Sequence, residues 1–178
     1  MINLIDQARK DAAALIENAY LKAAEQGHDG AQNNLANLYY NGTGVEKDCA
    51  EAFKWYQKAA DQGSMYGQYG LGRCYEYGNG AEKNPMESGK WYRKAADQGH
   101  PNAQLRLGDV LYQGKYYKDA VTWYQKAAKQ DLAAAQYQLG LCYECGNGVM
   151  KSKLTAKKWY KRAADQGHEK AKAKLKEM

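Results

Sequence analysis

The sequence predicts an all-α protein, a right-handed α–α superhelix of about four full antiparallel helix-pair repeats with a capping half-repeat at each end. Two observations lead to this prediction. The dipeptide Trp-Tyr recurs at residues 55, 91, 123 and 159, at spacings of 36, 32 and 36 residues. Between these dipeptides, apolar residues recur every three or four positions, which is typical of helices and not of strands.

The repeat divides the chain, taken as one domain of residues 1–178, into complete and partial copies. A single helix pair cannot bury its apolar stripe alone, so we expect neighbouring pairs to stack and share a continuous core. The predicted units are an N-terminal half-repeat 1–28, four repeats 29–64, 65–100, 101–132 and 133–168, and a C-terminal half-repeat 169–178.

The first helix of each repeat carries apolar or small residues at positions i, i+4, i+7 and i+8. In the 29–64 repeat these are Ala31, Leu35, Leu38 and Tyr39. This spacing places them on one helix face, which we expect to be core. Leu38 shares its core position with Cys74, Val110 and Cys142. The first helices are predicted to stop at Gly42-Thr43-Gly44, Gly78-Asn79-Gly80 and Gly146-Asn147-Gly148.

The second helix of each repeat has recognisable ends. Asp48 followed by Glu51 matches a capping box, and Asn84 precedes Pro85, which suits the first helical position. Ser152 occupies the same place in the last repeat. Glycines that fit the left-handed residue after a helix follow at Gly27, Gly63, Gly99 and Gly167.

The 101–132 repeat departs from this pattern. It lacks four residues between Gly114 and Trp123, and it has Leu111 and Asp131 where other repeats have tyrosine and glycine. We expect a shorter loop between its two helices.

The repeated motif resembles a known family. Residues 135–149 read Ala-x-x-x-Leu-Gly-x-x-Tyr-x-x-Gly-x-Gly-Val, and residues 156–167 closely match Ala-x-x-Trp-Tyr-x-Lys-Ala-Ala-x-Gln-Gly. This pattern is similar to the Sel-one-like repeat (SLR) family of the tetratricopeptide-like superfamily. The resemblance implies a non-catalytic adaptor or scaffold that holds a protein segment in a concave groove, or a regulator such as an immunity-type inhibitor of a toxin.

On each first helix, the stripe beside the core positions is predicted to be free for a partner. By similarity to tetratricopeptide arrays these residues line the groove, and their side chains do not repeat chemically. Tyr and Arg often carry interface energy, although Tyr66 and Tyr137 could instead fill gaps between helices. The predicted contact residues are Asn33, Asn37, Tyr40, Tyr66, Tyr69, Arg73, Tyr77, Leu105, Asp109, Tyr112, Tyr137, Leu141 and Glu144.

The net charge of +6 belongs to the C-terminal part of the chain. Residues 149–178 hold 10 basic and 3 acidic residues. We interpret this segment mainly as a solvated cap of the array. The alternative is a binding site for acidic surfaces, either nucleic acid or anionic membrane, but the aromatic residues are not interleaved with the lysines in a manner that suggests base stacking, so nucleic acid is not expected.

Chemical sites are weakly indicated. His28, His100 and His168 each follow Gln-Gly at the same point of the repeat, so we assign them to turns. Cys142 and Cys145 form one Cys-x-x-Cys pair, whereas structural zinc requires about four ligands. We therefore expect no metal, no cofactor and no catalysis, with all cysteines as free thiols. Without a leader or an apolar span, a cytoplasmic monomer is expected.

Overall fold

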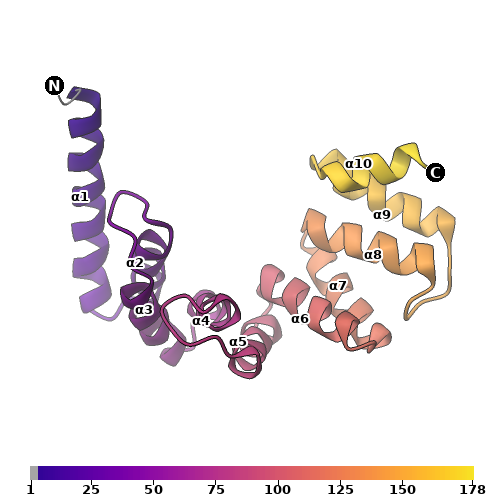
Figure 1. Cartoon of the computed structure of the whole chain (residues 1–178), viewed down its shortest axis with the longest axis horizontal. Coiled ribbons are helices and arrows are strands. Elements are labelled where there is room, and N and C mark those ends of the chain that lie inside the picture. The colour runs from indigo at the N-terminus through magenta and orange to yellow at the C-terminus, as the bar shows by residue number, and fades with distance from the viewer. Residues whose placement is uncertain (1–3) are drawn as a thin grey trace. The chain divides into compact units, whose positions relative to one another are not determined.

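The computed structural model describes residues 4–178, and it describes side chains for residue 12 and residues 14–178. All regular secondary structure in this part of the chain is helical, which confirms the predicted all-α class (Figure 1). The helices are α1 Leu4–Glu25, α2 Asp29–Asn41, α3 Cys49–Asp61, α4 Met65–Tyr77, α5 Pro85–Asp97, α6 Pro101–Gln113, α7 Tyr117–Lys129, α8 Ala133–Cys145, α9 Lys153–Asp165 and α10 Glu169–Lys176.

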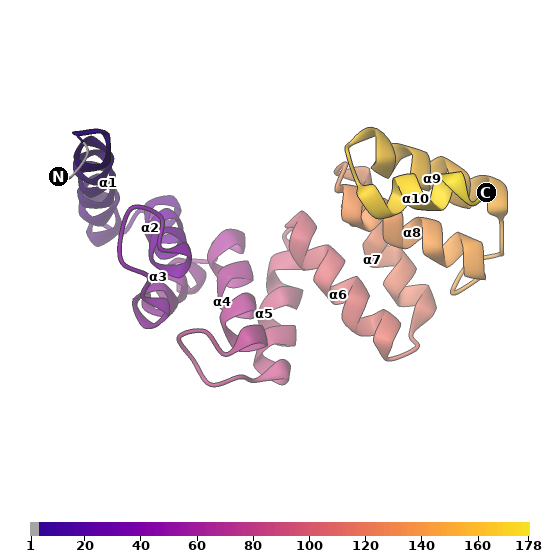
Figure 2. The same ribbon diagram turned by 45° about the horizontal axis from the view of Figure 1, so that its top comes forward.

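The chain divides into two compact units, residues 1–95 and 96–178. In the first unit α1 packs on α2, α2 on α3 and α3 on α4. In the second unit α6 packs on α7, α7 on α8, α8 on α9 and α9 on α10. Figure 2 shows open loops from α2 to α3, from α4 to α5 and from α8 to α9, and a tight turn from α6 to α7, as the shortened repeat predicts.

The shortened turn changes one predicted core position. Cys74 and Cys142, which occupy equivalent places in α4 and α8, are fully buried. Val110 of α6 is 54% exposed, so its assignment to the core is wrong. The physical reason is the missing loop, since only three residues, 114–116, separate α6 from α7.

The helix starts follow the predicted caps. The Asp48 carboxylate accepts hydrogen bonds from two backbone N–H groups in the first turn of α3, including that of Glu51. Asn84 and Ser152 cap α5 and α9 with their side-chain oxygens. The reciprocal half of the predicted capping box is absent at Asp48, because the Asp48 N–H donates to the Tyr39 carbonyl at 2.9 Å.

The helix ends follow the predicted glycines. Gly27, Gly63, Gly99 and Gly167 all have positive φ, where a side chain is disfavoured. In the shortened repeat, Asp131 takes the place of such a glycine and still adopts a φ of 59°. Lys115, in the tight turn after α6, has a φ of 64°. The repeat therefore imposes its backbone geometry even where glycine is missing.

The tyrosine of each Trp-Tyr pair fills the core between the two helices of its repeat. Tyr92 of α5 lies against α4 at Gly72, where an added Cβ would come within 2.5 Å of the tyrosine ring. A helix position that faces a ring this closely admits only glycine or a small residue. Equivalent pairs are Gly108 with Tyr124 and Gly140 with Tyr160.

The tryptophans of the same pairs lie nearer the surface, and each is covered by a basic side chain. The Lys58 ammonium lies 3.8 Å from the centroid of the Trp55 ring, and Lys94 and Lys126 cover Trp91 and Trp123 in the same way. Such cation–π contacts explain why a basic residue follows each Trp-Tyr pair at a fixed distance. The recurring Trp-Tyr-x-Lys sequence thus builds the fold.

Candidate functional site

The predicted contact residues on α2 are mostly engaged inside the first unit. Asn37 accepts a hydrogen bond from the Tyr56 hydroxyl at 2.6 Å. Tyr40 is only 7% exposed, and its hydroxyl accepts from the Asn79 amide at 2.9 Å. Asn33 is half-buried. Asn37 and Tyr40 therefore connect helices within the unit, which leaves little of these two side chains for a partner.

The predicted residues on α4 are arranged differently. Tyr66 and Tyr77, near the two ends of the helix, are 53% and 49% exposed. Between them, Tyr69 packs against the Tyr92 ring with centroids 5.6 Å apart, and the Arg73 guanidinium lies 4.3 Å from the centroid of the Tyr40 ring. We call Tyr66, Tyr69, Arg73 and Tyr77 the α4 stripe. Its spacing of i, i+3, i+7 and i+11 places all four residues along one side of α4.

The predicted residues on α6 serve the interior of the second unit. Leu105 packs against the buried cluster formed by α7 and α8. Asp109 accepts a hydrogen bond from the Tyr124 hydroxyl at 2.9 Å. Tyr112 accepts a hydrogen bond from the Asn147 amide at 2.6 Å. The Asp109 contact lies within its own repeat, whereas Leu105 and Tyr112 also contact the next one, and together these contacts leave little of this stripe for a partner.

The predicted residues on α8 are also engaged. Tyr137 stacks on the imidazole of His168 with centroids 4.7 Å apart, and Leu141 packs against the α9–α10 core. Glu144 accepts a hydrogen bond from the Tyr160 hydroxyl at 2.5 Å and pairs with Lys174 at 3.2 Å. The interpretation of Tyr137 as a residue that fills space between helices agrees with this packing.

The partners of the core tyrosines recur with a period of two repeats. In α2 and α6 the ninth residue, Asn37 or Asp109, accepts from the core tyrosine of the same repeat. In α4 and α8 the twelfth residue does so instead, as Glu76 accepts from Tyr92 and Glu144 from Tyr160. The hydrogen bonds from Asn79 to Tyr40 and from Asn147 to Tyr112 follow the same alternation.

Burial keeps the thiols of Cys74 and Cys142 and the imidazole of His100 in their neutral forms at neutral pH. Burial raises the pKa of the Cys74 and Cys142 thiols to about 12, so both remain protonated. Burial lowers the pKa of His100 to about 4, and its neutral Nδ1 accepts from the Ala103 N–H at 3.2 Å as the cap of α6. His168 caps α10 in the same way, so these histidines hold helix starts.

The cysteines and histidines form no metal-binding group in the part of the chain that the structure describes. All four cysteines are free thiols. No group of three or more His, Cys, Asp or Glu side chains is placed to hold a metal ion among these residues.

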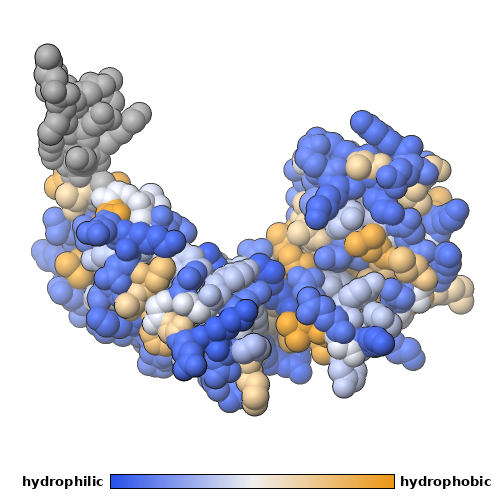
Figure 3. All heavy atoms as spheres, viewed as in Figure 1, coloured by the Kyte–Doolittle hydropathy of each residue, from blue (hydrophilic) through white to orange (hydrophobic). Residues whose placement is uncertain are grey.

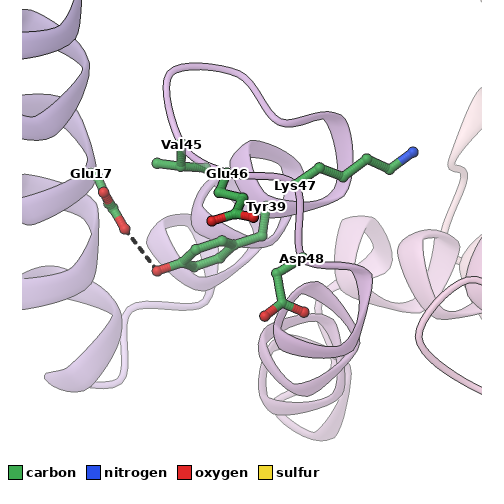
Figure 4. Close-up of a pocket in the computed structure, with 6 residues that line it drawn as sticks. All are labelled: Glu17, Tyr39, Val45, Glu46, Lys47 and Asp48. Carbon is green, nitrogen blue, oxygen red and sulfur yellow. Dashed lines mark hydrogen bonds between the residues drawn. The ribbon is translucent and has the colours of Figure 1, made fainter.

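A polar hollow beside the loop between α2 and α3 is a product of the repeat (Figure 4). Glu17, Tyr39 and residues 45–48 line it, and the Tyr39 hydroxyl donates to the Glu17 carboxylate at 2.8 Å. Burial, together with this carboxylate, raises the pKa of Tyr39 to about 12. An equivalent hollow lies at Tyr75 and residues 81–84 in the next repeat. Because it recurs with the loop, we do not assign it a separate activity.

Comparison with known families identifies the repeat. The Sel1 repeat matches residues 20–28, 30–64, 66–100, 101–132 and 133–168. The chain belongs to the Sel1 repeat family. This confirms the resemblance to Sel-one-like repeats that the motifs indicated. Comparison with curated proteins gives no match.

Solved structures show the same Sel1 repeat fold. A Sel1 repeat protein from Oxalobacter formigenes is 36% identical, with a TM-score of 0.81 over 90% of this chain and 48% of its own. A protective antigen of uropathogenic Escherichia coli with an SLR fold is 32% identical, with a TM-score of 0.80 over 95% of this chain and 40% of its own. The chain thus spans less than half the length of these two proteins.

A third similar structure adds a functional description. An immunity protein from Pseudomonas aeruginosa is 31% identical to this chain, with a TM-score of 0.64 over 96% of this chain and 69% of its own. Together these structures show that the chain has the Sel1 repeat fold. Among residues 4–178, no helix is both long enough and apolar enough to cross a membrane.

Proposed function

We propose that this Sel1 repeat protein is a non-catalytic scaffold that binds a segment of another protein along the α4 stripe. The observation that carries the proposal is that the repeat does not require Tyr66 and Tyr77. At the place of Tyr66 the other first helices have Gly30, Asn102 and Ala134, and at the place of Tyr77 they have Asn41, Gln113 and Cys145. Fold-building positions in this chain recur, whereas these two tyrosines occur in α4 alone.

The physical properties of the α4 stripe support this role. Tyr69 and Arg73 are held by the rings of Tyr92 and Tyr40, so the middle of the stripe is ordered before a partner arrives. Tyrosine and arginine bury large areas with few free rotors and still offer hydrogen-bonding groups, which is why they dominate interface energy. A row of such side chains along a helix suits an extended segment or a helix of the partner.

The test is a quantitative pull-down that compares the wild-type chain with Tyr66→Ala/Tyr77→Ala. These two side chains are half-exposed, so their removal leaves the core contacts of Tyr69 and Arg73 in place. Loss of two interface tyrosines should lower recovery of the specific partner roughly tenfold or more. The matched control is Tyr116→Ala, which removes a tyrosine that is 63% exposed elsewhere. Unchanged recovery by a correctly folded double variant would exclude the α4 stripe.

An immunity-type role is the more specific form of this proposal. It is favoured by the 31% identity to an immunity protein over nearly the whole chain. In such a role the chain would neutralise a toxin by covering its active surface. The partner recovered through the α4 stripe should then lose its toxicity when co-expressed with the wild-type chain and regain it with Tyr66→Ala/Tyr77→Ala. A partner that shows no toxicity of its own would point to an adaptor instead.

A further inference from the structure

Arg73 occupies a position that the core of its own repeat does not use. In α2 and α6 the ninth residue of the helix is Asn37 or Asp109, and each accepts a hydrogen bond from the core tyrosine of its repeat. In α4 the twelfth residue, Glu76, accepts from the Tyr92 hydroxyl instead. The ninth position of α4 is therefore not required for this contact, and it carries Arg73.

The repeat that most resembles that of α4 shows what the fold accepts at this position. The two repeats share the sequence Leu-Gly-x-Cys-Tyr-Glu-x-Gly-Asn-Gly, at residues 71–80 and 139–148. The two positions that differ are those of Arg73 and Tyr77, which both belong to the α4 stripe. In α8 the first of them is Leu141, which packs against the α9–α10 core. A leucine satisfies the fold here, so the fold does not account for the arginine.

The Arg73 guanidinium is half-buried and has no carboxylate partner. It lies 4.3 Å from the centroid of the Tyr40 ring. In the part of the chain that the structure describes, it forms no salt bridge and donates no hydrogen bond to another protein group. A charge that is partly removed from water is normally paired. The donors of Arg73 are therefore available to an acceptor on another molecule.

Few other charges lie on the helices that surround this guanidinium. Besides Arg73, the charged residues of α2 and α4 are Asp29, which begins α2, and Glu76. Glu76 is bound to the Tyr92 hydroxyl and forms no salt bridge with Arg73. Residues 1–95 hold 11 Lys/Arg and 12 Asp/Glu, so this unit has no excess positive charge to attract a polyanion. The positive charge of Arg73 is local and suits a single carboxylate.

The side chains beside Arg73 along the helix are aromatic. Tyr69 and Tyr77 lie four residues before and after it, about one helical turn away on either side. Over this unit Figure 3 shows pale and apolar side chains mixed with charged ones, and no broad apolar area on the face in view. A guanidinium offers paired N–H donors that match the two oxygens of a carboxylate. The row therefore combines one polar anchor with aromatic contact area.

We propose that Arg73 selects the partner of the α4 stripe by pairing with one carboxylate, from an Asp or Glu side chain, in an otherwise uncharged segment that contacts the flanking tyrosines. This pairing rests on the proposed function, because it names the chemistry that the same stripe recognises. The tyrosines supply contact area, whereas Arg73 supplies a preference for one residue type at one position of the segment.

The experiment selects short random peptides, displayed on phage, on the immobilised full chain. The wild-type chain is compared with Arg73→Leu and with Tyr66→Ala/Tyr77→Ala. Arg73→Leu is expected to fold, because α8 has Leu141 at the same place in a closely matching sequence. Circular dichroism confirms that each variant is folded. Duplex DNA is offered to the same chains in a separate binding measurement.

The wild-type chain should enrich peptides that carry Asp or Glu at one fixed position, and Arg73→Leu should lose this preference. A selected peptide and its Glu→Gln or Asp→Asn version are then compared by fluorescence anisotropy. Removal of the carboxylate should weaken binding to the wild-type chain roughly tenfold or more, but binding to Arg73→Leu by less than about threefold. Such a difference isolates the pairing from other effects of each change.

Two further variants separate geometry from charge. Arg73→Lys keeps the positive charge but lacks the planar pair of donors, so its affinity for the acidic peptide should lie between those of the wild-type chain and Arg73→Leu. The matched control is Lys90→Gln, which removes one positive charge from an exposed residue of α5 outside the stripe. It should change the affinity by no more than about twofold, since exposed charges away from a site act weakly.

The possible failures are distinguishable. If the wild-type chain enriches no peptides, or if these bind Tyr66→Ala/Tyr77→Ala equally well, the α4 stripe is not the binding site and both proposals are wrong. If the peptides need the two tyrosines but show no acidic preference, or if loss of the carboxylate weakens both chains equally, the stripe binds and only the role of Arg73 is wrong. Binding of duplex DNA that Arg73→Leu abolishes would also overturn that role.

Discussion

Among single residues, several first-helix glycines of the Sel1 repeats lie directly against the core tyrosine of the second helix. At Gly72 an added methyl group would lie 2.5 Å from an atom of the Tyr92 ring, and this ring is itself held by Glu76 and Tyr69. A buried ring with partners on two sides cannot move aside without cost.

Gly72→Ala should therefore lower the free energy of unfolding by about 1–3 kcal/mol, the usual cost of overpacking a core. The matched control is Gly89→Ala in α5, where nothing lies within 4 Å of an added Cβ. That change should be neutral or should stabilise the chain by up to about 1 kcal/mol through helix propensity. Denaturant unfolding measures both, and equal effects of the two substitutions would show that the ring contact is not limiting.

A second single residue, His100, should make the free energy of unfolding depend on pH. Its pKa falls from 6.5 to about 4 because burial disfavours the charged imidazole, and its neutral Nδ1 caps α6. Between these two pKa values the unfolded chain binds the proton more readily, so the stability from His100 is complete above pH 6.5 and is lost as the pH falls toward 4. From pH 7 to pH 5 this loss should be roughly 2 kcal/mol.

The measurement is the difference in unfolding free energy between the wild-type chain and His100→Asn as a function of pH. Asparagine keeps an acceptor for the Ala103 N–H but has no proton to gain, so the other titrating groups cancel in the difference. The wild-type chain should lose its advantage over the variant below pH 6.5. A difference that stays constant from pH 7 to pH 5 would contradict the buried, neutral imidazole.

For the helices and loops, the sequence predicted most of the boundaries and missed the connections between repeats. Helix ends could be predicted because left-handed glycines and capping side chains act locally, within a few residues. The contacts of Tyr40 and Tyr112 could not, because each hydroxyl reaches an asparagine in the loop of the next repeat. Only the three-dimensional packing shows that these predicted contact residues point into their own unit.

The Tyr40–Asn79 hydrogen bond should therefore carry coupling energy between the first two full repeats. In a double-mutant cycle, Tyr40→Phe and Asn79→Ala should show about 1 kcal/mol of interaction energy, the usual net value of a buried hydrogen bond. A cycle of Tyr40→Phe with Thr43→Ala, an exposed loop residue, serves as the control and should be additive. Additivity in both cycles would mean that the bond does not stabilise the pair of repeats.

For the predicted contact residues, too, the sequence predicted their position on the helix but not their exposure. Sequence spacing correctly placed the predicted residues along one side of each first helix, since that follows from helical periodicity. It could not distinguish Tyr77, which is half-exposed, from Tyr40, which is buried one repeat earlier, because the exposure of each side chain depends on its contacts with the loop of the next repeat. Comparison of equivalent positions separates these cases, since structural tyrosines recur and Tyr66 and Tyr77 do not.

For the molecule as a whole, the two compact units carry different surfaces. The first unit holds the α4 stripe, which is rich in tyrosine. The second holds the lysine-rich helices α9 and α10. Composition predicted the basic C-terminal segment directly, but it could not show which of its lysines form salt bridges, as Lys174 does with Glu144.

Site-specific photo-crosslinking in the cells that make the chain is the most direct test of whether the α4 stripe binds a protein partner. A photoreactive amino acid replaces Tyr66 or Tyr77 in separate variants, and Tyr116 in the control. We expect one discrete adduct shared by the substitutions at Tyr66 and Tyr77 and absent at Tyr116. An adduct of equal yield at Tyr116, or none at the two positions in α4 while the partner still co-purifies, would contradict it.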